Sequence, residues 1–383
     1  MSQLRPYQEL AVETAVKAKR ATIKAATGTG KTIIAVEWIK SLEKQTLIIV
    51  PTQALIYQSW APKLQEAGLL DVGQYYAYSK TEGPVIVTTY ASATSHPELI
   101  QNADAVVLDE VHHLGARTAL RRILPLLTFK EYVLGLSSVP EREDEAHRMF
   151  LQQFPICFDL GLGDALRDGI VSPLEVIPVP AEMNADERKN YDTYTARIQS
   201  AFRFCGPNIV KWRNCYDPKR KLFVGRLAIA SISKRKTLLS SVEQKKTAVH
   251  DILKKHEGKL AIVFAESVDA IEEIKNFLLQ EGITCDTFHS RVESWRRMEL
   301  LEEWGKRFDV LLSCRALEEG LDVKEVAVGI LIANGKSKRQ FIQRIGRVIR
   351  PVEGKLAKFY VVYCPATVEE NYAKTIEKII QTE

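Results

Sequence analysis

The sequence predicts an α/β protein with two parallel-sheet domains joined by a mixed segment. Short, continuously apolar runs alternate with amphipathic helical stretches up to about residue 158, and the same alternation returns from residue 259 to the end. Such runs between helices are typical of parallel strands covered on both faces. The chain has 383 residues, which is too long for one hydrophobic core and suits two domains.

The predicted strands fall into two series. In the first series we expect strands at 21–25, 46–51, 84–89, 104–110 and 131–138, with helices at 32–43 and 52–67 between them. In the second series we expect strands at 259–267, 282–290, 308–314, 326–333 and 357–364. We therefore place the first domain at residues 1–160, a linker with a basic segment at 161–240, and the second domain at 241–383.

The composition excludes several classes of protein. Hydrophobic residues make up 46% of the chain, which favours a globular protein over a disordered one. No apolar run approaches the roughly 20 residues needed to cross a bilayer, and the N-terminus lacks the pattern of a signal peptide. We expect a soluble intracellular protein without a membrane partner.

The six cysteines are scattered and form no C-x-x-C pair. This pattern argues against a zinc or iron–sulfur site and favours free thiols in a reducing compartment. Cys205 and Cys215 are the pair that could instead form a disulfide.

Positive charge is concentrated in one segment. Between Arg197 and Lys236 there are eleven Lys or Arg residues and one acid, Asp217, whereas the whole chain has a net charge of only +5. Aromatic residues such as Phe202, Trp212 and Phe223 lie among the basic ones. Lysine and arginine contact phosphates while bases stack on aromatic rings, so this segment, including Lys219, Arg220 and Lys221, is a candidate nucleic-acid contact. The alternative is an ordinary solvated basic surface.

The stretch "KAATGTGKT" (Lys24 to Thr32) predicts a phosphate-binding loop. It follows a predicted strand and opens a predicted helix, although Ala25 stands where the usual pattern has a first glycine. Backbone N–H groups at the start of a helix can converge on phosphate oxygens. We expect Lys31 to reach the β and γ phosphates and the Thr32 hydroxyl to ligate Mg²⁺. The nucleotide-binding set also includes Thr27, Gly28, Thr29 and Gly30.

The stretch "VVLDEVHH" (Val106 to His113) predicts an acid pair at the end of a buried strand, where ligands of open α/β sheets bind. We expect Asp109 to hold Mg²⁺ and Glu110 to act as the general base toward water. His112 is expected to link this site to other parts of the protein, and His113 to pack structurally.

Together these two motifs resemble those of superfamily two helicases, which implies two tandem RecA-like motor domains. "LRPYQ" (Leu4 to Gln8) is similar to the segment that recognises adenine, and implies nucleotide contacts from Arg5 and Gln8. "SCRALEEGLDV" (Ser313 to Val323) resembles a box that brings Gly320 and Asp322 near the nucleotide. "QFIQRIGRVIRP" (Gln340 to Pro351) resembles the arginine-finger box. Its Arg347 and Arg350 lie three residues apart on one helix face and suit developing phosphate charge.

The resemblance also implies contacts with a nucleic-acid strand. The residues concerned belong to short boxes of both domains and are Pro51, Thr52, Thr88, Thr89, Ser267, His289, Arg291, Ser313 and Arg315.

A narrower resemblance is to archaeal XPB-type helicases. Arg142, Glu143 and Asp144 follow the third box, as in that family, where an Arg-Glu-Asp element assists strand separation. The family also carries a small helical thumb between its motor domains, which matches residues 186–233. The chain starts close to "LRPYQ", so we expect the family's N-terminal damage-recognition domain to be either absent or supplied by an accessory protein.

The resemblance implies an ATP- and Mg²⁺-dependent DNA helicase that moves 3′ to 5′ on a single strand or forked duplex, in DNA repair or related processing. The protein is then expected to be a monomer, either cytoplasmic and nucleoid-associated or encoded by a virus. The third box reads Ser137-Ser138-Val139 instead of the usual Thr/Ser-Ala-Thr. A duplex-DNA translocase that does not unwind therefore remains an alternative, as does a nucleic-acid-binding scaffold that uses ATP as a switch. An RNA helicase is disfavoured because the specific resemblance is to DNA-repair motors.

Overall fold

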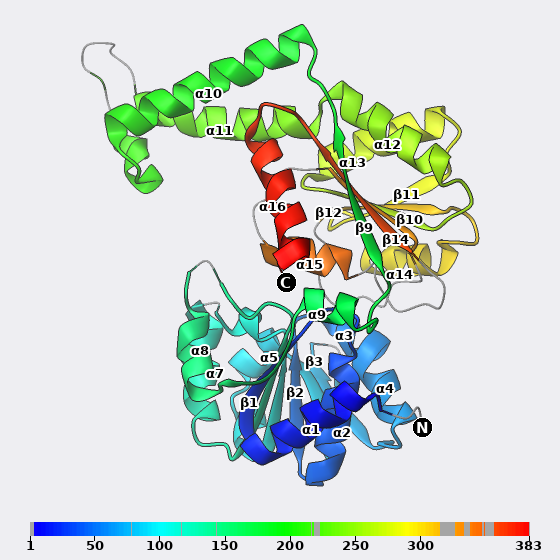
Figure 1. Ribbon diagram of the computed structural model, residues 1–383. Coiled ribbons are helices and arrows are strands. Elements are labelled where there is room, and N and C mark those ends of the chain that lie inside the picture. Colours follow the sequence, from blue (N-terminus) through cyan, green and yellow to red (C-terminus); the bar gives the residue numbers. More distant parts are fainter. Residues whose placement is uncertain are drawn as a thin grey trace.

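Two helix-covered sheets and a projecting pair of long helices form the protein (Figure 1). The computed structural model describes residues 4–77, 79–115, 117–142, 144–215, 217, 223–314, 326–332, 338–346, 348 and 356–382. The two tandem α/β domains with a helical insertion match the fold that the sequence predicts.

The first sheet has eight strands in the order β4-β3-β5-β2-β6-β7-β1-β8. All neighbours are parallel except β3 and β4, which pair antiparallel. Every residue of β2 and β6 is buried, because helices cover both faces of the sheet. The strands are β1 (Arg20–Ala25), β2 (Thr46–Val50), β3 (Val72–Tyr76), β4 (Ser79–Lys80), β5 (Val85–Thr89), β6 (Ala105–Asp109), β7 (Tyr132–Ser137) and β8 (Ile156–Leu160).

The helices of this half connect its strands and pack on the sheet. They are α1 (Pro6–Ala18), α2 (Lys31–Leu42), α3 (Gln53–Leu55), the π-helix η1 (Ile56–Trp60), α4 (Ala61–Glu66), α5 (Tyr90–Ser95), α6 (Glu98–Asn102), the 3₁₀-helix η2 (Val111–Gly115), α7 (Arg117–Leu127), α8 (His147–Gln153) and α9 (Leu162–Arg167). The helix expected at 52–67 therefore forms, but it contains a π-helical turn.

The second sheet has six parallel strands in the order β11-β12-β10-β13-β14-β9. The strands are β9 (Leu174–Pro180), β10 (Ala261–Ala265), β11 (Cys285–Phe288), β12 (Val310–Cys314), β13 (Val328–Ile332) and β14 (Ala357–Tyr363). Strand β9 lies in the segment predicted as a linker, and this part of the prediction is wrong. It pairs with β14 over its whole length and forms an edge of the sheet, where its prolines are tolerated.

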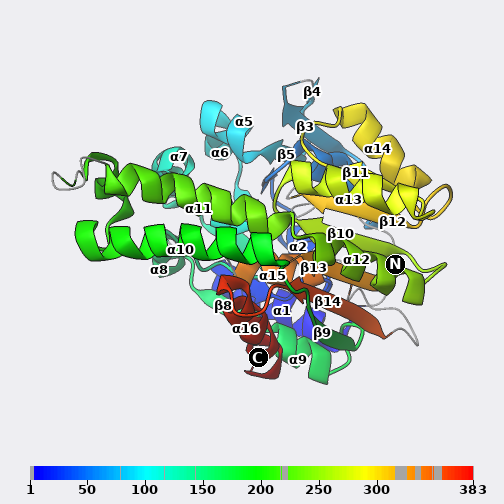
Figure 2. The same ribbon diagram turned by 90° about the horizontal axis from the view of Figure 1, so that it is seen from above.

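The helices around the second sheet include the helical insertion that the sequence predicted. They are α10 (Ala185–Cys205), the 3₁₀-helix η3 (Ile209–Asn214), α11 (Val224–Ser240), α12 (Glu243–Lys255), α13 (Val268–Gln280), α14 (Ser294–Glu303), α15 (Lys338–Ile345) and α16 (Val368–Thr382). Figure 2 shows α10 and α11 running side by side as an arm that projects away from the sheets. We call α10, η3 and α11 the thumb.

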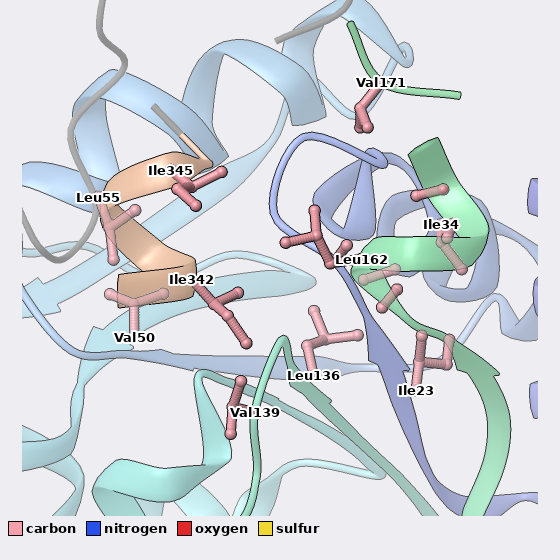
Figure 3. Close-up of a cluster of buried hydrophobic side chains, with 14 of the residues drawn as sticks. Ile23, Ile34, Val50, Leu55, Leu136, Val139, Leu162, Val171, Ile342 and Ile345 are labelled. Carbon is pink, nitrogen blue, oxygen red and sulfur yellow. The ribbon is translucent and has the colours of Figure 1, made fainter. Parts of the chain in front are cut away.

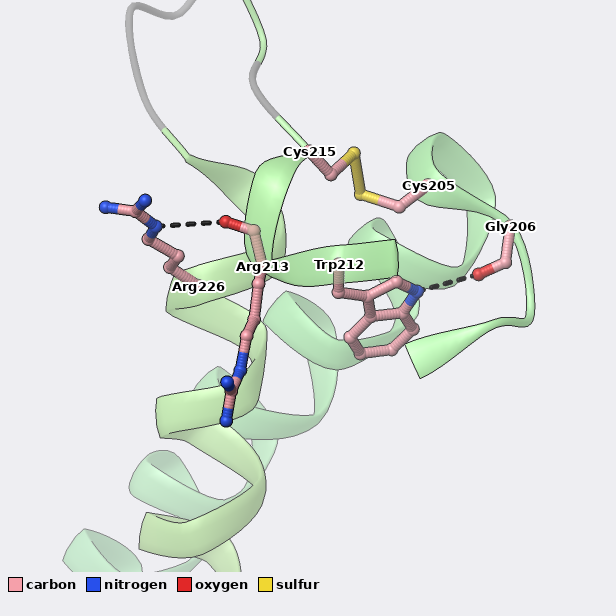
Figure 4. The surroundings of a disulfide bond; sticks show 6 residues. All are labelled: Cys205, Gly206, Trp212, Arg213, Cys215 and Arg226. Atoms are coloured by element: carbon pink, nitrogen blue, oxygen red, sulfur yellow. Dashed lines mark hydrogen bonds between the residues drawn. A yellow bond between two sulfur atoms is a disulfide. The ribbon is translucent and has the colours of Figure 1, made fainter. Parts of the chain in front are cut away.

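The thumb has its own small core, and its end is closed by a disulfide (Figure 4). Cys205 and Cys215 are bonded, with their Cα atoms 6.0 Å apart, so the expectation of free thiols is wrong for this pair. Trp212, which lies between the two cysteines in the sequence, is fully buried and donates its Nε1–H to the Gly206 carbonyl at 2.8 Å. Cys157, Cys285, Cys314 and Cys364 are free, as expected.

The two sheets share one continuous apolar cluster. Ile342 and Ile345 of α15, in the second domain, lie in the same buried cluster as Val50, Leu55 and Leu136 of the first domain (Figure 3). Burial of apolar surface stabilises such contacts by about 25 cal/mol per Å². Helix α15 is therefore packed against the first domain.

Candidate nucleotide site and domain interface

The predicted phosphate loop joins β1 to α2. Gly28 and Gly30 have φ angles of 91° and 85°, in the left-handed region that favours glycine. Ala25 is not among the residues with positive φ, so the missing first glycine of the motif costs no backbone strain. Gly30 is the N-cap of α2 and offers no capping side chain. This geometry leaves the N-terminal end of α2 suited to a phosphate group.

The Lys31 ammonium points back into the loop. Its Nζ donates to the carbonyl oxygens of Ala25 at 3.0 Å and Ala26 at 3.4 Å. The Thr29 hydroxyl donates to the same Ala26 carbonyl at 2.8 Å. The loop is thus held in shape by its own side chains, with a cation at its centre and the Thr32 position at the start of the helix. These residues fit a bound triphosphate with its metal ion.

The N-terminal segment lies directly against this loop. Tyr7 Oη and Gln8 Nε2 both donate to the Thr29 carbonyl, at 2.8 and 3.1 Å, and Gln8 is buried. The Gln8 Oε1 accepts the Arg5 backbone N–H at 3.0 Å. The Arg5 guanidinium donates to the Ile170 carbonyl at 3.0 Å. Gln8 therefore stands beside the phosphate loop, and Arg5 stands next to Gln8.

The acid pair lies at the C-terminal end of β6. Asp109 is 7% exposed, and its Oδ2 accepts the Trp60 Nε1–H at 2.9 Å. Tyr90 Oη donates to the Asp109 carbonyl at 3.0 Å. Glu110 follows with a φ of 50°, which is unusual for a residue with a side chain and costs on the order of 1–3 kcal/mol. Such strain often marks a functional position.

Burial sets the ionisation of Asp109. Removal from water and the neighbouring Glu110 charge raise the pKa of Asp109 to about 6, against the lowering effects of the Trp60 hydrogen bond and the Lys31 and Lys63 charges. The Lys31 charge is therefore close enough to act on the acid pair. Ionisation of this carboxylate is unfavourable without a nearby positive charge, and a bound cation would supply that charge.

A chain of polar contacts connects Glu110 to the third box and the Arg-Glu-Asp element. The Ser137 hydroxyl donates to Glu110 Oε2 at 3.3 Å, and His112 Nδ1 lies 3.4 Å from the same oxygen. Arg142 donates from Nη1 to the His112 carbonyl at 2.5 Å. It also pairs with Asp144 through two hydrogen bonds of 2.8 Å. His113 stacks on Tyr90, with ring centroids 5.9 Å apart.

The second domain reaches the phosphate loop through α15. A Cβ built on Gly346 would stand 2.2 Å from the Thr27 Cβ, so these two residues are in direct contact. Two positions earlier, Arg344 is buried and pairs with Glu266 at 3.0 Å. The described part of the box that carries the two predicted arginine fingers therefore contacts the phosphate loop.

The residues expected to contact a nucleic-acid strand differ in how their polar groups are used. The hydroxyls of Thr52 and Ser313 are buried and have no partner among the described residues. Ser267 and Thr89 cap α13 and α5 by accepting backbone N–H groups, at 3.1 and 3.2 Å. The Thr88 hydroxyl donates to the Tyr75 carbonyl at 2.6 Å. Thr88 is fully buried, so this geometry does not support a direct phosphate contact from it.

The remaining described candidates lie at the ends of strands. Pro51 directly follows β2 and is half-buried. His289 directly follows β11, is buried, and places Nε2 2.7 Å from Glu272. Arg291 is exposed and pairs with Asp269 at 2.8 Å. Other predicted site residues lie outside the described residues: Glu143, Lys219, Arg220, Lys221, Arg315, Gly320, Asp322, Arg347 and Arg350.

Several residues of the site were missed in the sequence. Trp60 and Tyr7 contact Asp109 and the phosphate loop, but in the sequence each reads as an ordinary helical aromatic residue. Gly346 stands inside the arginine-finger box, and its role as a contact point becomes visible only when the two domains are packed. Among the described residues no group of three or more His, Cys, Asp or Glu side chains could hold a metal ion. The described helices also include none long and apolar enough to span a bilayer.

Comparison with known sequence families agrees with the two halves of the fold. Residues 1–142 match the family described as "Type III restriction enzyme, res subunit", and residues 244–352 match "Helicase conserved C-terminal domain". These two matches contain the phosphate loop, the acid pair and α15.

Curated relatives match over most of the chain. A "DNA 3'-5' translocase XPB2" of Sulfurisphaera tokodaii is 28% identical over 91% of this chain and 79% of its own length. A "Putative DNA 3'-5' helicase Rad25" of Halobacterium salinarum is 28% identical over 99% of this chain and 57% of its own length. A "DNA 3'-5' helicase XPB" of Mycobacterium tuberculosis is 25% identical, and the chain covers 62% of it. The chain thus spans less than two thirds of the last two relatives.

Among solved structures, the helicase domain of Pyrococcus furiosus Hef has a TM-score of 0.63 and covers 98% of both chains at 17% identity. This similarity supports the fold. The two matched families and the relatives named XPB or Rad25 support an XPB-like superfamily two helicase.

Proposed function

We propose that this chain is an ATP-dependent DNA helicase or translocase that moves 3′ to 5′ and couples nucleic-acid-stimulated ATP hydrolysis to strand separation. The observation that carries the proposal is the contact between Gly346 and Thr27. It brings a described residue of the arginine-finger box to the phosphate loop of the other domain. This contact supports a nucleotide site with one wall from each domain. Relatives named as DNA 3′–5′ helicases or translocases support DNA as the substrate and support the direction.

On the first domain, the observed geometry supports the proposed roles. The Lys31 ammonium, now on the carbonyls of Ala25 and Ala26, would turn to the phosphates. Thr32 and Asp109 would hold Mg²⁺, and the Trp60 hydrogen bond fixes the Asp109 carboxylate for this task. ATP with Mg²⁺ supplies the transferable phosphoryl group and the charge that activates it.

Glu110 is the proposed general base. Ser137 and His112 hold its Oε2, which orients the carboxylate without removing its charge. On the second domain, Arg347 and Arg350 are the proposed groups that stabilise charge on the phosphates during transfer. Gly320 and Asp322 are proposed to face the same nucleotide.

Strand contacts are proposed to come from both domains, mainly at phosphates and therefore with little sequence preference. The free hydroxyl positions at Thr52 and Ser313 fit this role. If a strand across both domains favours their packing, it also favours hydrolysis, because both ligands bind the same conformation better. The Arg-Glu-Asp element is proposed to help separate strands, and its Arg142 contact to the His112 carbonyl connects it to the acid pair.

A duplex-DNA translocase without unwinding is the second candidate. One observation favours it: Val139 of the third box is buried at 8% exposure in the apolar cluster, where it offers no hydrogen bond to couple hydrolysis to strand opening. A forked duplex assayed beside a triplex-displacement substrate separates the two functions. Strand separation supports the helicase, and triplex displacement without it supports the translocase.

The test of the proposed function is the ATPase rate measured without nucleic acid and with single-stranded DNA, duplex DNA or RNA. We expect stimulation by DNA, and loss of turnover in Lys31→Ala. DNA-independent ATP binding without phosphate release would favour a scaffold that uses ATP as a switch. Stimulation by RNA alone would contradict a DNA motor.

A further inference from the structure

Glu266 is an almost buried carboxylate that, among the described residues, is shared by two cations from two other elements. It directly follows β10, and its side chain is 4% exposed. Its Oε1 lies 3.0 Å from Arg344 Nη2, and its Oε2 lies 3.6 Å from Lys236 Nζ. Arg344 belongs to α15, and Lys236 belongs to the thumb helix α11.

The Arg344 end of this bridge leads to the phosphate loop. The Arg344 side chain is 1% exposed, and its guanidinium lies 5.7 Å from the centre of the Phe264 ring. Two residues later, Gly346 contacts Thr27. The position of Arg344 therefore helps to set how α15 approaches the nucleotide site.

The Lys236 end leads to the thumb. Helix α11 begins at Val224, beside the disulfide-closed end, and packs along α10. The Lys236 side chain is 33% exposed, so it can move with α11 more readily than Arg344 can move in the core. A displacement of α11 changes the distance between Lys236 and the carboxylate that also orients Arg344.

We propose that Glu266 is a positioning residue that couples the thumb to α15, so that nucleic acid on the thumb adjusts the fit of α15 against the phosphate loop. The inference rests on the proposed function and adds a physical connection to it. Removing a positive charge from beside a buried carboxylate destabilises the protein, because the negative charge is then left uncompensated in the interior. Two cations from different elements on one such carboxylate therefore have linked positions.

The test compares Lys236→Met with Lys234→Met. Both changes remove one positive charge from α11, but Lys234 is exposed and lies two residues away, on the other side of the helix. We expect Lys236→Met to reduce the stimulation of the ATPase by single-stranded DNA about fivefold or more, which is the usual range of coupling between sites. Lys234→Met should keep the wild-type ratio of stimulated to unstimulated rate.

Affinity for DNA is measured on the same variants by fluorescence anisotropy. If Lys236→Met and Lys234→Met weaken DNA binding equally and share one stimulation ratio at saturating DNA, Lys236 is only a basic surface residue, and the inference is overturned. A wild-type ATPase that DNA does not stimulate would instead overturn the proposed function itself.

A double-mutant cycle tests Glu266 directly. Glu266→Gln should lower the stimulation ratio, and adding Lys236→Met to it should lower the ratio little further, since both act through one bridge. Additive losses would show independent roles and contradict the coupling. Thermal unfolding of each variant shows whether the fold is intact. If Glu266→Gln does not fold, the comparison of the two lysine variants still decides.

Discussion

Gly346 in the second domain touches Thr27 in the phosphate loop of the first, with no room for a side chain between them. A Cβ at position 346 would stand 2.2 Å from the Thr27 Cβ and 2.4 Å from its Cγ2. Contacts this short do not occur, so with a residue larger than glycine either Thr27 or the chain at position 346 must shift. The close contact between these two segments thus requires glycine, which has no Cβ, at position 346.

Gly346→Ala should therefore lower the ATPase rate without abolishing nucleotide binding. The added methyl group displaces α15 from the phosphate loop, and a misplacement of about 1 Å can cost on the order of 100-fold in rate. We expect kcat to fall at least about tenfold, whereas the affinity for nucleotide falls less, because Lys31 itself is unchanged. Steady-state ATPase assays and fluorescent-nucleotide titration measure the two quantities.

Gly161→Ala is the matched control. Gly161 has an ordinary φ of −63°, and a Cβ there would meet only the Asp164 Oδ2 at 3.5 Å. This variant should keep the wild-type kcat. A Gly346→Ala protein with an unchanged kcat would show that the observed packing of α15 is not needed for turnover.

Glu110→Gln should still bind ATP but hydrolyse it very slowly. The amide keeps the size of the side chain and an oxygen for the Ser137 hydroxyl, but it cannot accept a proton from water. Loss of a general base typically costs about 10²–10⁴-fold in rate. Single-turnover measurement of phosphate release separates this step from binding, and undiminished release would remove Glu110 from the role of base.

Much of this site could be predicted from the sequence because its signals are local. The phosphate loop, the acid pair and the buried strands each depend on residues that are neighbours in the chain. The features that were missed join distant segments: β9 pairs with β14, Trp60 contacts Asp109, and Gly346 contacts Thr27. No short pattern encodes such pairings.

The disulfide between Cys205 and Cys215 could not be predicted from the sequence either. A spacing of ten residues between Cys205 and Cys215 permits a bond but does not require one. What decides it is the packing of η3 around Trp212, which brings the two Cα atoms within 6.0 Å. The sequence favoured free thiols, because the six cysteines are scattered and form no C-x-x-C pair.

Replacing Cys205 and Cys215 by serine should loosen the end of the thumb. Closing a loop of this size stabilises a fold by about 3 kcal/mol in the chain-entropy model. We expect faster hydrogen exchange across residues 205–215 in the double-serine variant. A reducing agent should have the same effect on the wild-type protein and none on the variant. Equal exchange in oxidised and reduced wild-type protein would contradict a stabilising role.

Lys245→Met should destabilise the second domain strongly. Lys245 and Glu369 are both 1% exposed in their side chains and lie 2.7 Å apart, linking α12 to α16. Burial raises the pKa of Glu369 even with Lys245 present. Removing the lysine leaves a buried, unpaired carboxyl group and should cost about 3–5 kcal/mol of the free energy of unfolding.

Chemical denaturation measures this loss, with Lys255→Met as the control. Lys255 lies on the same helix but is exposed, so its loss should change stability by less than about 0.5 kcal/mol. In Lys245→Met/Glu369→Gln the charge is removed while an acceptor for the Cys364 N–H is kept, and part of the stability should return. A double variant no more stable than Lys245→Met would contradict the unpaired carboxyl group as the cause.

Asp109→Asn should stabilise the ligand-free protein increasingly as the pH rises. The pKa of Asp109 is raised from 3.8 to about 6, mainly by burial and then by the Glu110 charge. The folded protein thus holds this proton more tightly than the unfolded chain, so ionisation of Asp109 costs stability between about pH 4 and pH 6. Below this window the variant and the wild-type protein should be equally stable. Above it the variant should be more stable by about 3 kcal/mol, since each pKa unit corresponds to about 1.4 kcal/mol.

Denaturant unfolding at pH 4 to 8, without nucleotide or divalent cation, tests this expectation. Asparagine keeps an oxygen for the Trp60 N–H, so the comparison isolates the charge. Asp144→Asn gives the opposite sign, because the Arg142 guanidinium holds the pKa of Asp144 below its usual range and its ionised form stabilises the fold. If the difference in unfolding free energy between Asp109→Asn and wild type stays constant with pH, ionisation of Asp109 does not destabilise the folded protein. A difference that grows between pH 4 and pH 6 and then stays constant would mean that the ionised Asp109 destabilises the ligand-free protein.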